Sequence, residues 1–321
     1  MMRLLPLLAL LALLSVSCSP SKGVSTSTPI SQPILNTPMP LPTPSNEQPT
    51  PLLQGNPTLS SLLDVTYCTV NGVELKMDVY FPLIQNGPVP AVVYVHGGGW
   101  SQGDKRSSVG NSEAFLLTDA GFVVFAVNYR LAPEYRFPAM IEDVKCAIRS
   151  IRAHSAEYNI DQNRIGAFGA SAGGHLVSLL GTSDINAGFD MGEYLEYSSR
   201  VQAVVDIFGP ADLTLQNFSD EQIQNARQVF TADQLMPASP VTYISPDDPP
   251  FLILHGDRDE VVPLEQSQVL YDALTSGGVS ADFVIVQNAG HGFQSDADVP
   301  IQPTYQQISQ LIVEFFEGQL K

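Results

Sequence analysis

Ser171 is the side chain of this sequence best suited to nucleophilic chemistry. It stands between Gly169 and Gly173 in a Gly-x-Ser-x-Gly pattern, after a short apolar run and before the start of a helical segment. The pattern predicts a tight strand-to-helix turn with an exposed serine hydroxyl, a nucleophile elbow. The flanking glycines allow the strand and the helix to approach more closely than a β-carbon would permit. The N-terminal N–H groups and dipole of the helix would stabilise negative charge at the serine oxygen.

The same pattern is also typical of a structural turn with an incidental serine, so acyl transfer requires further parts. N–H donors for an oxyanion are the first of these. Three consecutive glycines, residues 97–99, follow a predicted buried strand. Main chain without side chains can approach a ligand closely. We predict an oxyanion hole formed by the N–H groups of Gly98, Gly99 and Ala172, with a flexible glycine turn as the alternative.

His291 is the predicted general base for Ser171. It lies between Gly290 and Gly292 on a loop that directly follows the last predicted strand. This position gives the chain order serine, acid, histidine. The other histidines belong to the glycine loop, lie one turn along the helix after the serine, or end other segments: His96, His175, His154 and His255.

Three carboxylates follow the apolar strand at residues 251–254 and are candidates for the acid that orients the base: Asp257, Asp259 and Glu260. We prefer Asp259, because Asp257 is better placed to bond the backbone of the turn and Glu260 should face solvent. Turn chemistry and helix capping explain all three equally well, so physical reasoning on the sequence leaves the choice open.

Alternating apolar strand and helix patterns surround these residues. The predicted strands are residues 91–95, 122–127, 201–208, 251–254 and 281–286, and the predicted helices are residues 138–154, 263–275 and 303–316. Residues 64–69 and 73–81 should form an antiparallel hairpin at Asn71-Gly72. This alternation predicts an α/β fold, with a mostly parallel central sheet and helices on both faces.

Two insertions interrupt the alternation, at residues 182–197 and 211–243. The second contains two capping-box patterns, residues 219–222 and 231–234, that predict short helices. Insertions after sheet strands can form a small cap that shapes an acyl pocket. A surface excursion far from the chemistry is an equally good interpretation.

The N-terminal part of the chain predicts export. Residues 1–18 have the charge and the short apolar run of a signal peptide. Cys18 ends a sequence that resembles a lipoprotein cleavage box, with ordinary secretion as the alternative. Residues 19–58 are rich in Pro, Ser and Thr, which predicts a disordered linker before a catalytic domain at residues 59–321.

Composition excludes several classes of partner. The formal charge of −18, from 33 Asp and Glu against 15 Lys and Arg, makes nucleic-acid binding and an anionic membrane surface unfavourable. We therefore expect membrane contact only through the N-terminal lipid anchor. No metal-ligand spacing or cofactor motif is recognisable, so we expect neither. Cys68 and Cys146 each have apolar neighbours, and we expect them to be unpaired, buried cysteines.

Residues 64–320 resemble the α/β-hydrolase carboxylesterases of the hormone-sensitive-lipase-like and feruloyl-esterase-like groups. The motifs that carry the resemblance are His96-Gly97-Gly98-Gly99-Trp100 with Gly103-Asp104, Asn128-Tyr129-Arg130-Leu131-Ala132-Pro133, Gly169-Ala170-Ser171-Ala172-Gly173-Gly174-His175, His255-Gly256-Asp257-Arg258-Asp259-Glu260-Val261-Val262-Pro263 and Gly290-His291-Gly292-Phe293. In this family the acid is the aspartate three residues after the glycine of the His-Gly pair, which is Asp259. The His-Gly-x-x-Asp form resembles the feruloyl-esterase-like and peptidase-like branches more than the hormone-sensitive-lipase branch.

The resemblance implies a serine carboxylesterase that acts through an acyl-enzyme on short-chain acyl esters, without a cofactor. The substrate would be a small-molecule or carbohydrate ester, and a carbohydrate esterase of the acetyl-xylan or feruloyl type is an alternative. The same triad could also serve an amidase or a peptidase. A non-catalytic binding module is a further alternative, from a different functional class.

Overall fold

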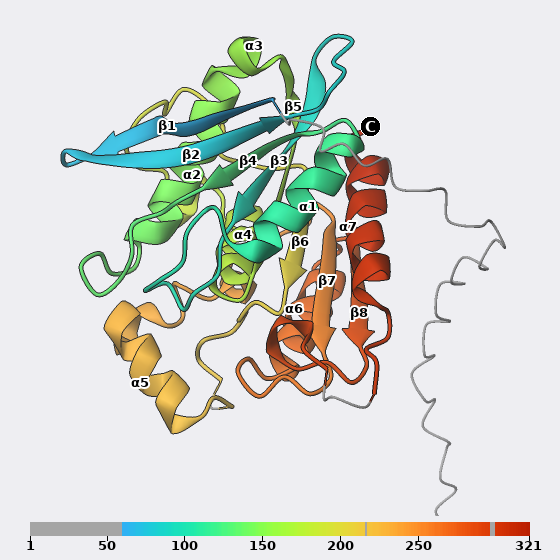
Figure 1. The fold of residues 1–321 in the computed structure, drawn as a ribbon. Coiled ribbons are helices and arrows are strands. Elements are labelled where there is room, and N and C mark those ends of the chain that lie inside the picture. The colour runs from blue at the N-terminus through green and yellow to red at the C-terminus, as the bar shows by residue number, and fades with distance from the viewer. Residues whose placement is uncertain (1–59, 216, 296–298) are drawn as a thin grey trace, which may run out of the picture. The chain divides into compact units, whose positions relative to one another are not determined.

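The computed structural model describes residues 60–215, 217–295 and 299–321 (Figure 1). The predicted signal peptide at residues 1–18, Cys18 and the predicted linker at residues 19–58 lie outside the described residues. Within the described part of the chain, no helix has both the length and the apolar character needed to cross a membrane.

One eight-stranded sheet with the order β1-β2-β4-β3-β5-β6-β7-β8 forms the centre of the fold. Its strands are β1 (Ser60–Val70), β2 (Val73–Phe81), β3 (Val89–Val95), β4 (Val123–Val127), β5 (Ile160–Ala170), β6 (Ala203–Ile207), β7 (Phe251–Gly256) and β8 (Ala281–Val286). β2 is antiparallel to both of its neighbours, and the strands from β4 to β8 are parallel. The predicted mostly parallel sheet is confirmed.

The hairpin between β1 and β2 turns at Asn71-Gly72, as predicted. Both turn residues have positive φ, at 50° and 84°, which asparagine and glycine tolerate best. Beyond the hairpin, β3, β4, β6 and β7 are almost wholly buried. Strands covered on both faces need apolar side chains at successive positions, which explains their continuous apolar runs.

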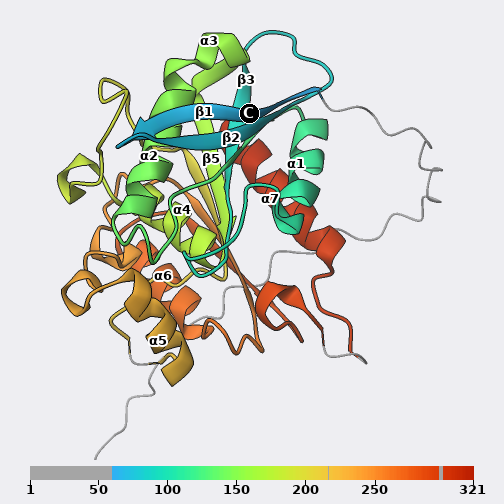
Figure 2. The same ribbon diagram turned by 60° about the vertical axis from the view of Figure 1, so that its left-hand side comes forward.

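Helices cover both faces of the sheet (Figure 2). They are α1 (Ser108–Asp119), α2 (Ala139–Ala153), α3 (Ser155–Tyr158), α4 (Ala172–Thr182), α5 (Asp220–Val229), α6 (Glu265–Ser276) and α7 (Tyr305–Leu320). Val93 and Val95 of β3 pack in the cluster with α2, α4 and α6, whereas Val92 and Tyr94 pack in the cluster with α1 and α7. The sequence analysis assigned no helix to α1 or α3.

α5 belongs to the insertion at residues 211–243 and lies beyond the helical layers, toward the carboxyl ends of β6 and β7 (Figure 1). Both predicted capping boxes are present. The Ser219 N–H donates to Gln222 Oε1 over 2.6 Å at the start of α5, and the Thr231 N–H donates to Gln234 Oε1 over 3.0 Å at a 3-10 turn, Ala232–Gln234.

The insertion at residues 182–197 packs instead against α2. Lys145 and Arg149 of that helix are buried and form ion pairs with Asp190 of the insertion, at 3.1 and 2.7 Å. These pairs hold the segment on the surface of α2, so the surface-excursion interpretation holds for this insertion.

The expectation that Cys68 and Cys146 are unpaired is wrong. They form a disulfide that joins β1 to α2, with a Cα–Cα distance of 6.5 Å and a sequence separation of 78. Both residues are buried, as their apolar neighbours suggested. The prediction failed because the packing of α2 against β1 is a long-range contact that no local pattern encodes.

Candidate active site

Ser171 lies on the sharp turn that connects β5 to α4. Its backbone has φ 57° and ψ −120°, a left-handed conformation that costs a residue with a side chain about 1–3 kcal/mol. A β-carbon on Gly169 would lie 2.5 Å from the main chain of Gly173, so these two positions admit only glycine. The Ser171 N–H donates to Ile207 O over 2.9 Å, which ties the turn to the end of β6.

His291 and Asp259 are brought to Ser171 by the loops after β8 and β7. His291 Nε2 lies 3.1 Å from Ser171 Oγ, and His291 Nδ1 lies 2.8 Å from Asp259 Oδ2. A carboxylate only accepts hydrogen bonds, so Nδ1 carries the proton. Nε2 is then free to accept from the serine hydroxyl. The three residues predicted from the sequence form one continuous hydrogen-bonded relay.

Asp259 is held as an anion by its surroundings. Its Oδ1 accepts from the N–H groups of Val261 and Val262, each over 2.8 Å, and its side chain is buried. Burial alone would raise the pKa of Asp259, but the hydrogen bonds from His255 and His291 hold that pKa well below its ordinary value. The other two carboxylate candidates take different places. Asp257 accepts from the Ala289 N–H over 3.2 Å, as a turn residue would, and Glu260 is exposed.

His255 contacts Asp259 in addition to His291 and helps to hold its carboxylate in place. The sequence analysis did not assign this role. Its Nε2 is 2.8 Å from Val262 O and 3.4 Å from Asp259 Oδ2, and its Nδ1 is 2.7 Å from Ser267 Oγ. Since Val262 O accepts only, Nε2–H is the donor and Nδ1 accepts from Ser267. The available signal was the spacing of four residues between His255 and Asp259 across the turn.

The glycine loop packs directly on the serine turn. A β-carbon on Gly97 would lie 2.7 Å from Ala170 O and 3.5 Å from Ser171 Cβ. Gly98 and Gly99 have φ of +109° and +58°, and Gly99 and Ala172 line the same cavity as Ser171. The loop therefore lies where oxyanion donors are needed, and donation by Gly98, Gly99 and Ala172 stays a prediction.

His175 is fixed as a neutral side chain under the glycine loop. It is fully buried, its Nδ1 accepts from Trp100 Nε1 over 3.1 Å, and its Nε2 donates to Ala238 O over 2.7 Å. Burial lowers the pKa of His175 to about 4. It joins Trp100 to the insertion and has no contact with the serine hydroxyl, as expected from its place on the helix.

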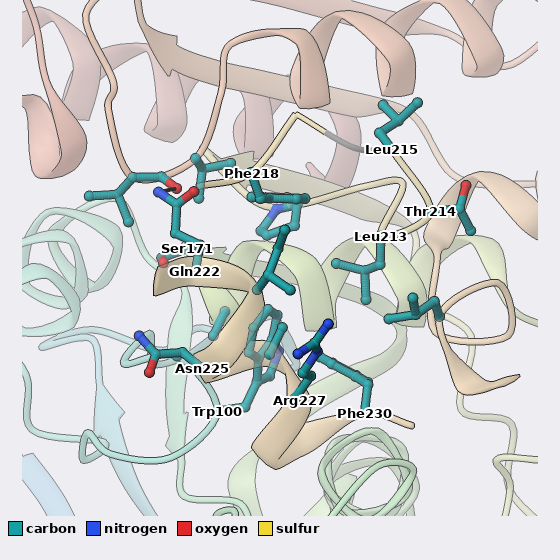
Figure 3. A pocket seen from close by; sticks show the side chains of 18 of the residues that line it. Trp100, Ser171, Leu213, Thr214, Leu215, Phe218, Gln222, Asn225, Arg227 and Phe230 are labelled. Atoms are coloured by element: carbon teal, nitrogen blue, oxygen red, sulfur yellow. Dashed lines mark hydrogen bonds between the residues drawn. The ribbon is translucent and has the colours of Figure 1, made fainter. Parts of the chain in front are cut away.

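A cavity of about 390 Å³ opens beside Ser171 (Figure 3). Trp100 and Phe230 meet edge to face, with ring centroids 5.0 Å apart, and form one apolar wall. Leu213, Phe218 and Leu235, together with several further residues of the insertion at residues 211–243, complete the lining. The cap interpretation therefore holds for this insertion. Among the residues the structure describes, no group of three or more His, Cys, Asp or Glu is arranged to hold a metal ion.

An eight-stranded sheet of this order, with a serine on the sharp turn after β5 and its histidine and aspartate on later loops, defines an α/β-hydrolase-fold protein. Within this class, the chain belongs to the BD-FAE family, whose model matches residues 77–274.

The chain is similar to curated esterases of Mycobacterium tuberculosis. It is 35% identical to the probable carboxylic ester hydrolase LipM over 199 residues, which cover 59% of this chain and 45% of LipM. It is 33% identical to esterase LipC over 216 residues, which cover 64% of this chain and 53% of LipC. The chain thus spans about half the length of the curated relatives that it matches.

Solved structures of esterases share the fold over a larger part of the chain. A truncated form of a carbohydrate esterase from gut microbiota is 31% identical with a TM-score of 0.70, covering 83% of this chain and 98% of that one. The propionate-bound esterase Est2 of Thermogutta terrifontis is 26% identical with a TM-score of 0.68, covering 82% and 94%.

Proposed function

We propose that this protein is a serine carboxylesterase that hydrolyses its substrate through an acyl-enzyme. The observation that carries the proposal is the hydrogen-bonded chain from Ser171 through His291 to Asp259 beside a largely apolar cavity. The similarity to esterases in sequence and in fold supports it. An amidase or peptidase would use the same relay, but no observation favours it.

In the proposed reaction, Ser171 Oγ attacks the ester carbonyl while His291 Nε2 takes its proton. The N–H groups of Gly98, Gly99 and Ala172 hold the oxyanion of the tetrahedral intermediate. His291 then returns the proton to the leaving alcohol, and water repeats the cycle on the acyl-enzyme. The anionic Asp259, hydrogen-bonded to Nδ1, stabilises the imidazolium form of His291 in both halves of the cycle.

A carbohydrate ester is the second candidate substrate. Two solved carbohydrate-esterase structures, each 31% identical to this chain, favour it, one of them from the bifunctional GH43-CE protein of Bacteroides eggerthii. The lining of the cavity combines apolar side chains with neutral amides and hydroxyls, such as Gln222 and Thr214.

The test is hydrolysis of p-nitrophenyl esters from acetate to palmitate, with acetylated xylan and methyl ferulate measured in parallel. We expect turnover of short-chain esters that is lost in Ser171→Ala, with the variant's circular dichroism unchanged. Ser276→Ala, at an exposed serine that ends α6, is the matched control and should retain turnover. A Ser171→Ala variant with full activity would overturn the proposed mechanism. Labelling of wild-type Ser171 by a fluorophosphonate without ester turnover would redirect the proposal to amides.

We also propose that the protein is exported and anchored by a lipid on Cys18, with residues 19–58 as a tether. The disulfide between Cys68 and Cys146 supports an oxidising compartment, where such bonds persist. Metabolic labelling with an alkynyl fatty acid tests the anchor: wild type should be labelled and sediment with membranes, and Cys18→Ala should be unlabelled. A wild-type protein that is secreted without label would refute the anchor but not export.

A further inference from the structure

Arg227 of α5 is the one charged side chain among the described residues that line the cavity beside Ser171. The other polar side chains of this lining are neutral amides and hydroxyls, such as Gln222 and Asn225. In Figure 3, Arg227 lies beside Trp100 and Phe230 at the cavity. Arg227 is exposed at this cavity, so its charge stays hydrated in the free protein and can meet a charged group of a bound ligand there.

The guanidinium group of Arg227 makes no hydrogen bond or ion pair with the described residues; the hydrogen bond that Arg227 accepts from Arg136 goes to its main-chain oxygen. Several other arginines of this acidic chain have carboxylate partners, for example Arg130 with Asp143 at 2.7 Å and Arg149 with Asp190 at 2.7 Å. A planar guanidinium binds a carboxylate through two parallel hydrogen bonds, which makes an anionic ligand its natural partner.

The backbone of α5 is fixed at both ends, so Arg227 is held at the cavity in advance of binding. At the start of the helix, Gln222 Nε2 donates to Glu260 O over 2.9 Å, next to the loop of the acid. At its end, Arg136 Nη2 donates to Arg227 O over 2.7 Å, and the Phe137 N–H donates to the main chain at the last residue of the helix over 3.1 Å. These bonds fix the backbone of α5, so less conformational entropy is lost on binding than if Arg227 stood on a free loop.

A purely structural role is the competing explanation. Arg227 lies in the last turn of α5, where a positive charge interacts favourably with the helix dipole. That role contributes to the stability of the helix and predicts the same effect of substitution on every substrate. Discrimination between charged and neutral esters separates the two explanations.

We propose that Arg227 binds a carboxylate of the substrate, so that the site prefers esters that carry an anionic group in either their acyl or their alcohol part. This inference rests on the proposed esterase function and names the substrate class of that same site. The interaction is made in the ground state as well as in the transition state, so it should act mainly on KM.

Two matched pairs of esters test the inference and locate the carboxylate. The first pair compares mono-p-nitrophenyl glutarate, which carries a carboxylate on its acyl part, with the neutral p-nitrophenyl pentanoate. The second pair compares 4-acetoxybenzoate, which carries a carboxylate on its alcohol part, with its neutral methyl ester. Each pair is measured with wild type, Arg227→Met, Arg227→Lys and the control Lys76→Met, which removes an equal charge from β2, away from the cavity lining.

We expect the charged-to-neutral ratio of kcat/KM to fall about tenfold in Arg227→Met for one pair, through KM. Arg227→Lys should retain part of the ratio, and Lys76→Met should retain all of it. An equal loss on charged and neutral esters, or no loss on either pair, would overturn the inference. Hydrolysis of the neutral esters by wild type establishes the proposed function independently, and its absence would refute that function instead.

Discussion

Replacing Asp259 by asparagine should abolish most of the catalysis by forcing the wrong tautomer on His291. Asp259 Oδ1 accepts two main-chain N–H groups, from Val261 and Val262, each over 2.8 Å. An asparagine in this place must point its carbonyl oxygen at those donors, which leaves its NH₂ group facing His291 Nδ1. Two donors cannot bond each other, so Nδ1 gives up its proton and accepts instead.

The consequence at the other side of the ring follows directly. His291 Nε2, which lies 3.1 Å from Ser171 Oγ, then carries the proton and can no longer accept one from the serine. Loss of a correctly oriented base in this way costs about 10⁴-fold in kcat, or about 5.5 kcal/mol of transition-state stabilisation. The geometry of the site stays intact, because the two main-chain hydrogen bonds are retained.

The assay is kcat/KM for p-nitrophenyl acetate between about pH 6 and about pH 10, with folding followed by circular dichroism. Asp257→Asn is the matched control, because Asp257 accepts only a long 3.2 Å bond from the Ala289 N–H, and this variant should lose less than about tenfold. A folded Asp259→Asn variant that keeps more than about a tenth of wild-type activity would refute the tautomer argument.

Three further predictions concern the surroundings of the site. Burial raises the pKa of Asp206 to about 6, so its neutral form stabilises the fold below about pH 4, and this contribution is lost as pH rises through about 6. Relative to wild type, Asp206→Asn should therefore gain about 2 kcal/mol in free energy of unfolding from pH 4 to pH 7. A pH-independent difference would contradict this. Replacing Cys68 and Cys146 together by alanine should lower the free energy of unfolding by about 4 kcal/mol, because the disulfide closes a long loop. Urea denaturation measures this change, and an unchanged midpoint would argue against the contribution of the disulfide. Gly98→Ala should lower the rate of ester hydrolysis about a hundredfold, because the new β-carbon would lie 2.1 Å from Gln102 O at a backbone φ of +109° and displace the loop. Hydrolysis near the wild-type rate would show that the loop tolerates this displacement.

The residues that carry the chemistry could be predicted because short contiguous patterns encode them. The spacing of the glycines around Ser171 indicates a close approach of a strand and a helix. His291 could be identified because its loop directly follows the last strand. The parallel sheet could be predicted for the same reason, since burial on both faces requires apolar runs. The choice of Asp259 over Asp257 needed the family resemblance, because both fit the local chemistry of the turn.

Features that depend on contacts between distant segments were not predicted. The bond between Cys68 and Cys146 and the support of Asp259 by His255 both arise where separate elements pack. α1 shows the same limit: Phe115 and Leu116 are 50% and 43% exposed, so the apolar residues of this helix do not mark a single buried face. The capping-box pattern predicted where α5 begins, but no pattern in the sequence predicted how this helix is oriented on the domain.

The cap over the cavity is one contiguous segment, residues 211–243, that leaves the sheet after β6 and returns before β7. Several of its anchors on the rest of the domain are main-chain atoms, such as Glu260 O and the Phe137 N–H, which remain whatever side chains stand there. We expect a segment held in this way to be exchangeable between relatives. Substrate range and hydrolytic machinery can therefore evolve separately, and a chimaera with another relative's insertion should inherit the preference of the donor while keeping its own serine relay.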